Sequence, residues 1–92
     1  MHPSIKEIDR TDALHVLHYF GKGGVQPGSF TTALLEAISR ADDKNFAELA
    51  IVFPSVCIAY KLAIATEDGI EILHAICAEK IAPVISIMSV RS

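Results

Sequence analysis

The segment from Ser55 to Ala65 has no polar face, and this limits how the chain can fold. Only Lys61 interrupts its run of apolar side chains, which are Val56, Cys57, Ile58, Ala59, Tyr60, Leu62, Ala63 and Ile64. A helix that is apolar on all sides is stable in a globular protein only when other elements surround it. Even counted from Ala50, the stretch is shorter than the roughly 20 apolar residues that span a bilayer, and Pro54 breaks it. We therefore expect a central helix in a protein core and no membrane partner.

The composition predicts one small domain that associates with other copies of itself. A chain of 92 residues has room for a single core. Hydrophobic residues make up 51% of the chain and charged residues only 21%. This is more apolar surface than so small a domain can hide inside itself, and a second chain would bury the excess. We therefore expect a homo-oligomer.

Five helical segments are predicted, and glycine and capping residues set the ends of the first three. The first helix covers residues 11–20 and stops at Gly21. Ser29 is the expected N-cap of the second helix, because its hydroxyl can accept a hydrogen bond from a free backbone N–H group. Asp42 or Asp43 is the expected N-cap of the third helix.

Proline and glycine mark the remaining boundaries. Pro54 either ends the third helix or begins the fourth, because proline suits the first turn of a helix and not its interior. The fifth helix begins at the sequence from Thr66 to Gly69 and stops before Pro83. Helical spacing of apolar residues predicts a core around the fourth helix that consists of Phe30, Leu34, Ile38, Phe46, Leu49, Phe53, Ile58, Leu62, Leu73 and Ile76.

The expected fold class is therefore all-α, a compact bundle of four to five short helices in residues 1–83 with an extended C-terminal tail in residues 84–92. The tail is rich in β-branched residues, which favours a strand or an extended arm. Because Ser86 and Ser89 are three residues apart, a short sixth helix is the alternative. A lone strand finds no partner in a helical domain, so we expect the tail and exposed parts of the fifth helix to form a symmetric homodimer contact. The interaction candidates in the tail are Val84, Ile85, Ile87 and Val90.

The loop between the first two helices contains four of the five glycines, at positions 21, 23, 24 and 28. A glycine-rich loop that leads into a helix can bind an anion, and whether this one does stays open. We expect at least one of Gly23, Gly24 and Gly28 to have a positive φ, with Pro27 and Gly28 in the central positions of a type II turn. The interaction candidates in this loop are Gly23, Gly24 and Gln26.

The same loop is superficially similar to the phosphate-binding loop of partition-type ATPases, which begins with Lys-Gly-Gly as Lys22 does here. In this chain, the residues from Gln26 to Ser29 occupy the place of the second Gly-Lys pair. The lysine that would reach the phosphates is therefore absent, and Pro27 removes one backbone N–H group. The sequence also shows no parallel-sheet pattern. We therefore expect a turn and cap that connect two helices, and no nucleotide hydrolysis.

Two pairs of residues have the spacing of metal ligands on a helix. His15 and His18 share one helix face, and His74 and Cys77 share another. The four side chains would complete a tetrahedral zinc site if the first and fifth helices met. The pairs lack flanking ligands and tight loops, however, and partly buried histidines with a core cysteine are the commoner arrangement. We therefore expect no metal and no cofactor.

No residue set has the pattern of a catalytic site. A nucleophile needs a nearby base and a group that orients the base. Cys57 has only Lys61 as a charged neighbour one turn away, and it lies in the most apolar segment. The acidic pairs at residues 42–43 and 67–68 lie at predicted helix N-termini, where the helix dipole stabilises them. We therefore expect no enzymatic activity.

Charge and cysteine usage indicate the class of protein and its compartment. The eight Lys and Arg residues are scattered and the net charge is -3, without the basic stripe that binds nucleic acid. Cys57 and Cys77 lie in apolar runs, as buried thiols in a reducing compartment do. The first residues contain no apolar signal core. We expect a cytoplasmic protein that binds no nucleic acid.

One stretch resembles a family of small proteins encoded by bacteriophages of actinobacteria. The motif comprises Gly23-Gly24 and the run from Pro27 to Asp42, followed by Asn45, Leu49, Phe53-Pro54, Gly69-Ile70 and Leu73. The resemblance implies a phage or prophage origin and the cytoplasm of a bacterial host, and it carries over no functional residues. We expect an accessory protein that acts by protein–protein contact, with a host protein as a partner. The alternatives are a structural homo-oligomer without a host target, or a metal- or anion-binding protein.

Overall fold

The apolar segment that dominates the sequence forms the helix α4 (Pro54–Ala65). The computed structural model describes residues 7–78. The other helices in this range are α1 (Arg10–Tyr19), α2 (Ser29–Arg40), α3 (Asp43–Val52) and α5 (Gly69–Ala78), and the same range contains no strand. The prediction of an all-α bundle is confirmed. The tail at residues 84–92, with its interaction candidates, and the expected helix end before Pro83 lie outside the described residues.

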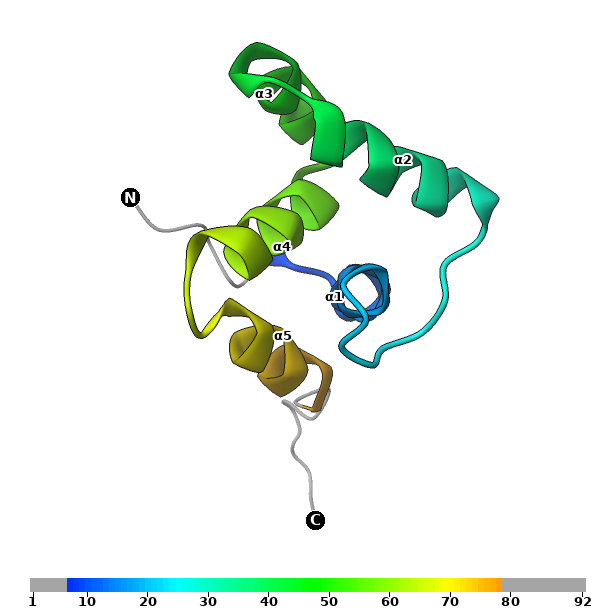
Figure 1. Cartoon of the computed structure of the whole chain (residues 1–92), viewed down its shortest axis with the longest axis vertical. Coiled ribbons are helices and arrows are strands. Elements are labelled where there is room, and N and C mark those ends of the chain that lie inside the picture. Colours follow the sequence, from blue (N-terminus) through cyan, green and yellow to red (C-terminus); the bar gives the residue numbers. More distant parts are fainter. Residues whose placement is uncertain (1–6, 79–92) are drawn as a thin grey trace.

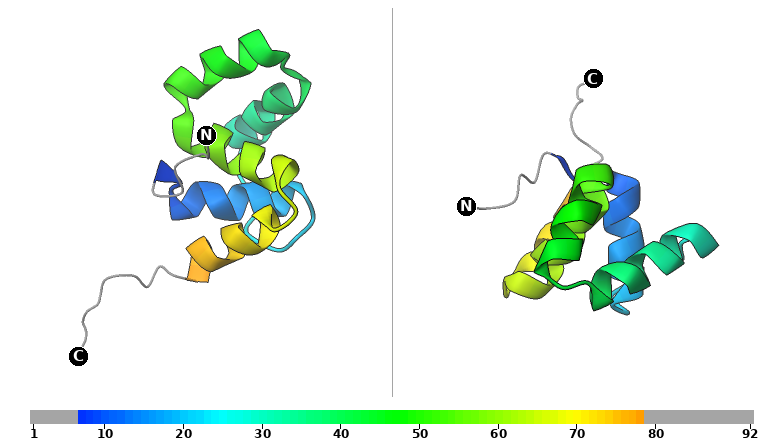
Figure 2. Two further views of the ribbon diagram at one scale, coloured as in Figure 1. Left: turned by 90° about the vertical axis from the view of Figure 1, so that its left-hand side faces the viewer. Right: turned by 90° about the horizontal axis from the view of Figure 1, so that it is seen from above.

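The core forms where α4 meets α1 and α5, while α3 and α5 lie at opposite ends of the molecule (Figures 1 and 2). From α4, the buried residues are Val56, Cys57, Ala59, Tyr60 and Leu62. The other helices add Ala13, Val16, Leu17, Leu35, Ile38, Leu73 and Cys77, and Ile8 precedes α1. The prediction that the fourth helix is central is therefore confirmed. In the described residues, no helix is long and apolar enough to cross a membrane.

The prediction of the core residues is correct except for Phe30. Ile38, Leu62 and Leu73 are buried, and the partly buried residues that pack against them are Leu34, Phe46, Leu49, Phe53, Ile58 and Ile76. Phe30 was expected inside, but 66% of it is exposed. Helical spacing shows that Phe30 shares a face with the later residues of α2. It does not show that only the C-terminal half of α2, with Leu35 and Ile38, is covered by other helices.

The hydrogen bonds at the helix ends explain where α1 and α3 stop and start. The N–H groups of Gly21 and Lys22 donate to the carbonyls of His18 and Leu17, and Gly21 has a φ of 70°, so α1 ends in a Schellman motif. The carboxylate of Asp42 accepts from the N–H of Asn45 at 2.8 Å. Gly21 as the stop of the first helix and Asp42 as the N-cap of the third are therefore confirmed. Pro54 begins α4 rather than ending α3.

The predicted start of α2 is wrong by one residue. Gly28 is the N-cap, and its carbonyl accepts the first helical hydrogen bond from Thr32 at 3.0 Å. Ser29 is therefore already helical, and no side chain caps this end. The φ of Gly28 is -73°, whereas a type II turn requires a positive φ at its second central residue, so the expected turn at Pro27 and Gly28 is also wrong.

Substitution of Leu62 by alanine tests the central position of α4. Leu62 is 4% exposed, so its loss leaves a cavity in the core and should lower the free energy of unfolding by about 2–5 kcal/mol. Ile64 of the same helix is 54% exposed, and Ile64→Ala is the matched control. Urea unfolding followed by circular dichroism measures both changes. Equal stability of the two variants would contradict the assignment of the core.

Candidate functional site

The glycine-rich loop is shaped by its close approach to α1. Gly23 and Gly24 have φ values of 100° and 73°, so the predicted positive φ is confirmed. The N–H of Val25 donates to the carbonyl of Leu14, and a Cβ atom at Gly24 would overlap with that same carbonyl oxygen. A Cβ atom at Gly23 would lie 3.6 Å from Cε1 of His74. The positive φ therefore explains Gly23, and the close approach to Leu14 together with a positive φ explains Gly24, without a ligand.

Gln26 lies in a shallow cavity of about 260 Å³ beside the loop. The cavity is lined by His18, Tyr19, Gln26, Pro27, Thr32 and Glu36. The carboxylate of Glu36 repels a negative charge, so this cavity has poor chemistry for an anion even though α2 begins nearby. The loop candidates Gly23, Gly24 and Gln26 are all exposed.

The four possible metal ligands are not brought together, although α1 and α5 pack against each other. His18 and His74 are exposed, whereas Cys77 is buried. Nδ1 of His15 is buried without a hydrogen-bond partner among residues 7–78. In that part of the chain, no group of three or more His, Cys, Asp and Glu side chains is placed to hold a metal ion.

Both cysteine thiols have the environment of core residues. Burial raises the pKa of Cys57, which is 0% exposed. Burial also raises the pKa of Cys77, and the nearby Arg10 guanidinium opposes this shift in part. The thiolate is the reactive form of cysteine, so a raised pKa makes each thiol a weak nucleophile at neutral pH.

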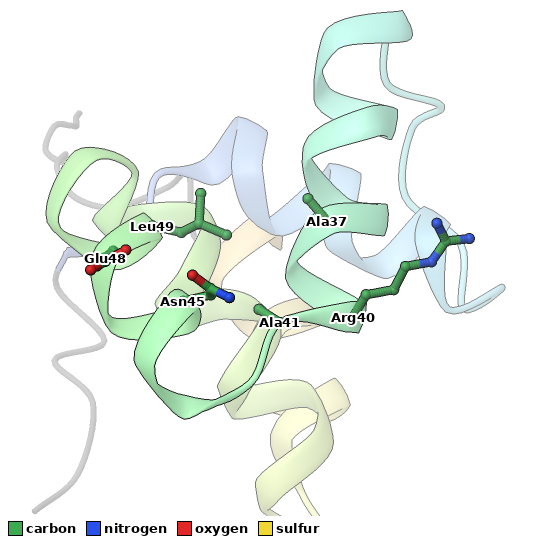
Figure 3. A pocket seen from close by; sticks show the side chains of 6 residues that line it. All are labelled: Ala37, Arg40, Ala41, Asn45, Glu48 and Leu49. Atoms are coloured by element: carbon green, nitrogen blue, oxygen red, sulfur yellow. The ribbon is translucent and has the colours of Figure 1, made fainter.

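The cleft between α2 and α3 has a volume of about 400 Å³ (Figure 3). It is lined by Ala37, Arg40, Ala41, Asn45, Glu48 and Leu49. Arg40 extends away from Asn45 and Glu48 in Figure 3, and Glu48 is paired with Lys44 at 2.9 Å. A specific small-molecule site needs polar groups that converge on one point, and this cleft does not provide them.

A further surface, which the sequence pattern did not predict, has the features of an interaction site. We define the α2–α3 apolar surface by Phe30, Leu34, Val52 and Phe53. The rings of Phe30 and Phe53 are 5.9 Å apart, and Leu34, Val52 and Phe53 line one groove of about 250 Å³. Phe30 and Val52 are each 66% exposed. This groove is also lined by Asp12, Thr31, Pro54, Ser55 and Val56.

The helix α3 is the reason that this surface exists. It contains no buried residue, and Ile51, beside Val52, is 80% exposed. Phe46 is held under α3 by a contact with α4, in which Nζ of Lys61 lies 4.5 Å from the ring centroid. The sequence contained one signal of this arrangement, because Ile51 and Val52 are apolar but fall outside the helical spacing of Phe46, Leu49, Ala50 and Phe53.

The fit of the loop against α1 predicts the effect of two glycine substitutions. Gly24→Ala adds a Cβ atom that overlaps with the Leu14 carbonyl at a positive φ, and should destabilise the protein by more than about 1 kcal/mol. Gly28→Ala is the control, because its φ is negative and its Cβ atom would meet nothing within 4 Å. Thermal unfolding compares the two variants. A stable Gly24→Ala variant would show that the loop is not fixed on α1.

The thiol environments predict slow chemical modification. Because burial raises both pKa values, Cys57 and Cys77 should react with a chromogenic disulfide reagent at neutral pH about tenfold or more slowly than free cysteine. Urea should restore the full rate. The neutral thiol is favoured in the folded state, so stability should fall as the pH rises above the ordinary thiol pKa. A fast-reacting thiol in the folded protein would reopen a catalytic role for cysteine.

Comparison of the chain with protein-family models, with curated proteins and with solved structures gives no match. The resemblance to proteins of actinobacterial phages therefore depends on the sequence motif alone. Within residues 7–78, the α2–α3 apolar surface is the most distinctive surface of the molecule.

Proposed function

We propose that this protein acts by binding another protein through the α2–α3 apolar surface, as an accessory protein of an actinobacterial phage in the cytoplasm of the bacterial host. The observation that supports this proposal is the exposure of Phe30 and Val52, at 66% each, beside the ring of Phe53. Large apolar side chains that gather at one exposed place are typical of a protein-binding surface. The sequence motif supports the phage origin. A phage origin in turn makes a protein of the bacterial host the expected partner.

The energetics of this surface favour a protein partner. Complete burial of one Val, Ile or Phe side chain contributes about 1.5–3 kcal/mol. A partner that covers Phe30 of α2 and Ile51 and Val52 of α3 would gain from apolar side chains that the two helices already present to solvent. Rigid aromatic residues lose little conformational entropy on binding, which makes Phe30 the expected centre of the contact.

Other ligand classes fit the described surface less well. The cavity at Gln26 contains the Glu36 carboxylate, and the cleft beside Asn45 lacks converging polar groups. The net charge of -3 gives no long-range attraction for nucleic acid. A second copy of this chain remains the alternative partner, and the same surface would then form a homo-oligomer.

A photo-crosslinking amino acid in place of Phe30 tests the proposal. In an actinobacterial lysate it should give one stoichiometric adduct with a host protein. Val52→Lys places a charge in the surface and should weaken this binding about tenfold or more, since about 1.4 kcal/mol accounts for each factor of ten. Mass spectrometry of the adducts and titration with the purified partner provide the measurements.

Two controls make the result specific. Ile64→Lys introduces the same charge at an apolar residue that is 54% exposed near the C-terminal end of α4, and it should leave the adduct unchanged. The crosslinker placed at the exposed Ala75 of α5 should give no adduct. An adduct of the chain only with itself would establish the homo-oligomer instead. Equal labelling from positions 30 and 75 would contradict binding through α2 and α3.

A further inference from the structure

The groove of the α2–α3 apolar surface carries one charge, and it lies on the side that α1 provides. The lining combines the apolar side chains of Leu34, Val52, Phe53 and Val56 with Asp12 of α1, the one charged residue that contributes to it within residues 7–78. Asp12 is half-buried, and its carboxylate forms no ion pair within that range. An occupant of the groove therefore meets an apolar surface with a single negative charge at its edge.

Two hydrogen bonds fix how the start of α1 faces the groove. The N–H of Asp9 donates to Oγ of Ser55 at 2.7 Å, and Ser55 lines the groove. Nε of Arg10 donates to the carbonyl oxygen of Cys77 at 2.8 Å, so this guanidinium is held by α5. Residues two apart on a helix do not face each other, and Arg10 therefore does not neutralise Asp12. The carboxylate of Asp12 is left for a ligand in the groove.

We propose that the groove binds a segment of the partner protein in which a Lys or Arg side chain directly flanks large apolar residues. The inference rests on the proposed function, because it assigns the chemistry of the partner that binds through this surface. The apolar residues pack against Leu34 and Phe53, and the cation pairs with Asp12. The groove volume of about 250 Å³ lies below the roughly 300–1,000 Å³ of small-molecule pockets, and it suits a few side chains of a protein segment.

The carboxylate of Asp12 sets what the occupant must provide. A purely apolar segment would remove water from this charge without replacing it, which is unfavourable. A cation on the segment supplies a partner, and the attraction between the two charges is stronger at a partly buried site than in bulk water. An acidic residue at the same place would be repelled. Asp12 therefore contributes selectivity between partners as well as affinity.

A symmetric contact between two copies of this chain fits the groove less well. In such a contact the same surface of each copy faces the other. The lining of the groove supplies one carboxylate and no Lys or Arg among the described residues. Each copy would then cover Asp12 with a surface that offers no opposite charge. The charge of the groove thus favours an outside protein over a symmetric homodimer at this place.

Two synthetic peptides test this preference without the host partner. They share one short leucine-rich sequence and differ in a single flanking residue, which is lysine in one and glutamate in the other. We expect the lysine peptide to bind the full-length protein about fivefold or more tightly than the glutamate peptide. It should shift the amide NMR signals of Thr31, Val52 and Ser55, which line the groove. Added salt should reduce the difference, because salt screens charges near the surface.

Substitution of Asp12 provides the second arm of the experiment. Asp12→Lys should reverse the preference, so that the glutamate peptide binds more tightly, and Asp12→Asn should abolish it. Asp43→Lys is the matched control, because Asp43 also lies in the first turn of its helix but does not line the groove. This variant loses the same interaction with a helix dipole and should keep the preference for lysine.

Three results would overturn the inference: equal affinity of the two peptides, no binding of either, or an unchanged preference in Asp12→Lys. Failure of the proposed function is distinguishable from these results. The crosslinked adduct from position 30 requires the host partner, whereas the peptide preference does not. A missing adduct beside an intact peptide preference would contradict the proposed function, and an adduct without any peptide preference would contradict only the assigned chemistry of the partner.

Discussion

The burial of α4 between α1 and α5 is the contact on which the rest of the structure depends. Its side chains from Val56 to Leu62 fill the core, and no other helix contributes as many buried residues within residues 7–78. Burial of apolar area is the main favourable term in the folding of so small a domain. The backbone of α5 must come very close to α4 for this packing, and Gly69 permits it, because a Cβ atom there would overlap with the carbonyl of Leu62.

This arrangement leaves α3 outside the core. The helix α3 packs against α4, where Nζ of Lys61 lies over the ring of Phe46, but it contains no buried residue. Phe46 and Phe53 anchor it on one side, while Ile51 and Val52 point into solvent. The excess of apolar residues in the composition thus has a definite place on the molecule. The homodimer contact expected at α5 has less support, because its exposed described residues are Glu71, His74, Ala75 and Ala78.

The glycine loop and the proposed binding surface illustrate two different uses of unusual residues. Gly24 is required by the close approach of the loop to Leu14, so the loop is a structural connector. Phe30 and Val52 are unusual because the fold leaves them exposed, and their exposure contributes nothing to the core. Exposed apolar residues of this size favour a protein partner.

The sequence by itself determined the helices, most of their ends and the central position of α4. Gly21, Asp42 and Pro54 act on hydrogen bonds within a few residues, and a helix that is apolar on all sides can only be buried. Only the tertiary structure decided that Phe30 is exposed, that Gly24 lies on α1 and that the possible metal ligands stay apart. Helical spacing shows which residues share a face, but the covering of that face depends on segments that are distant in the chain.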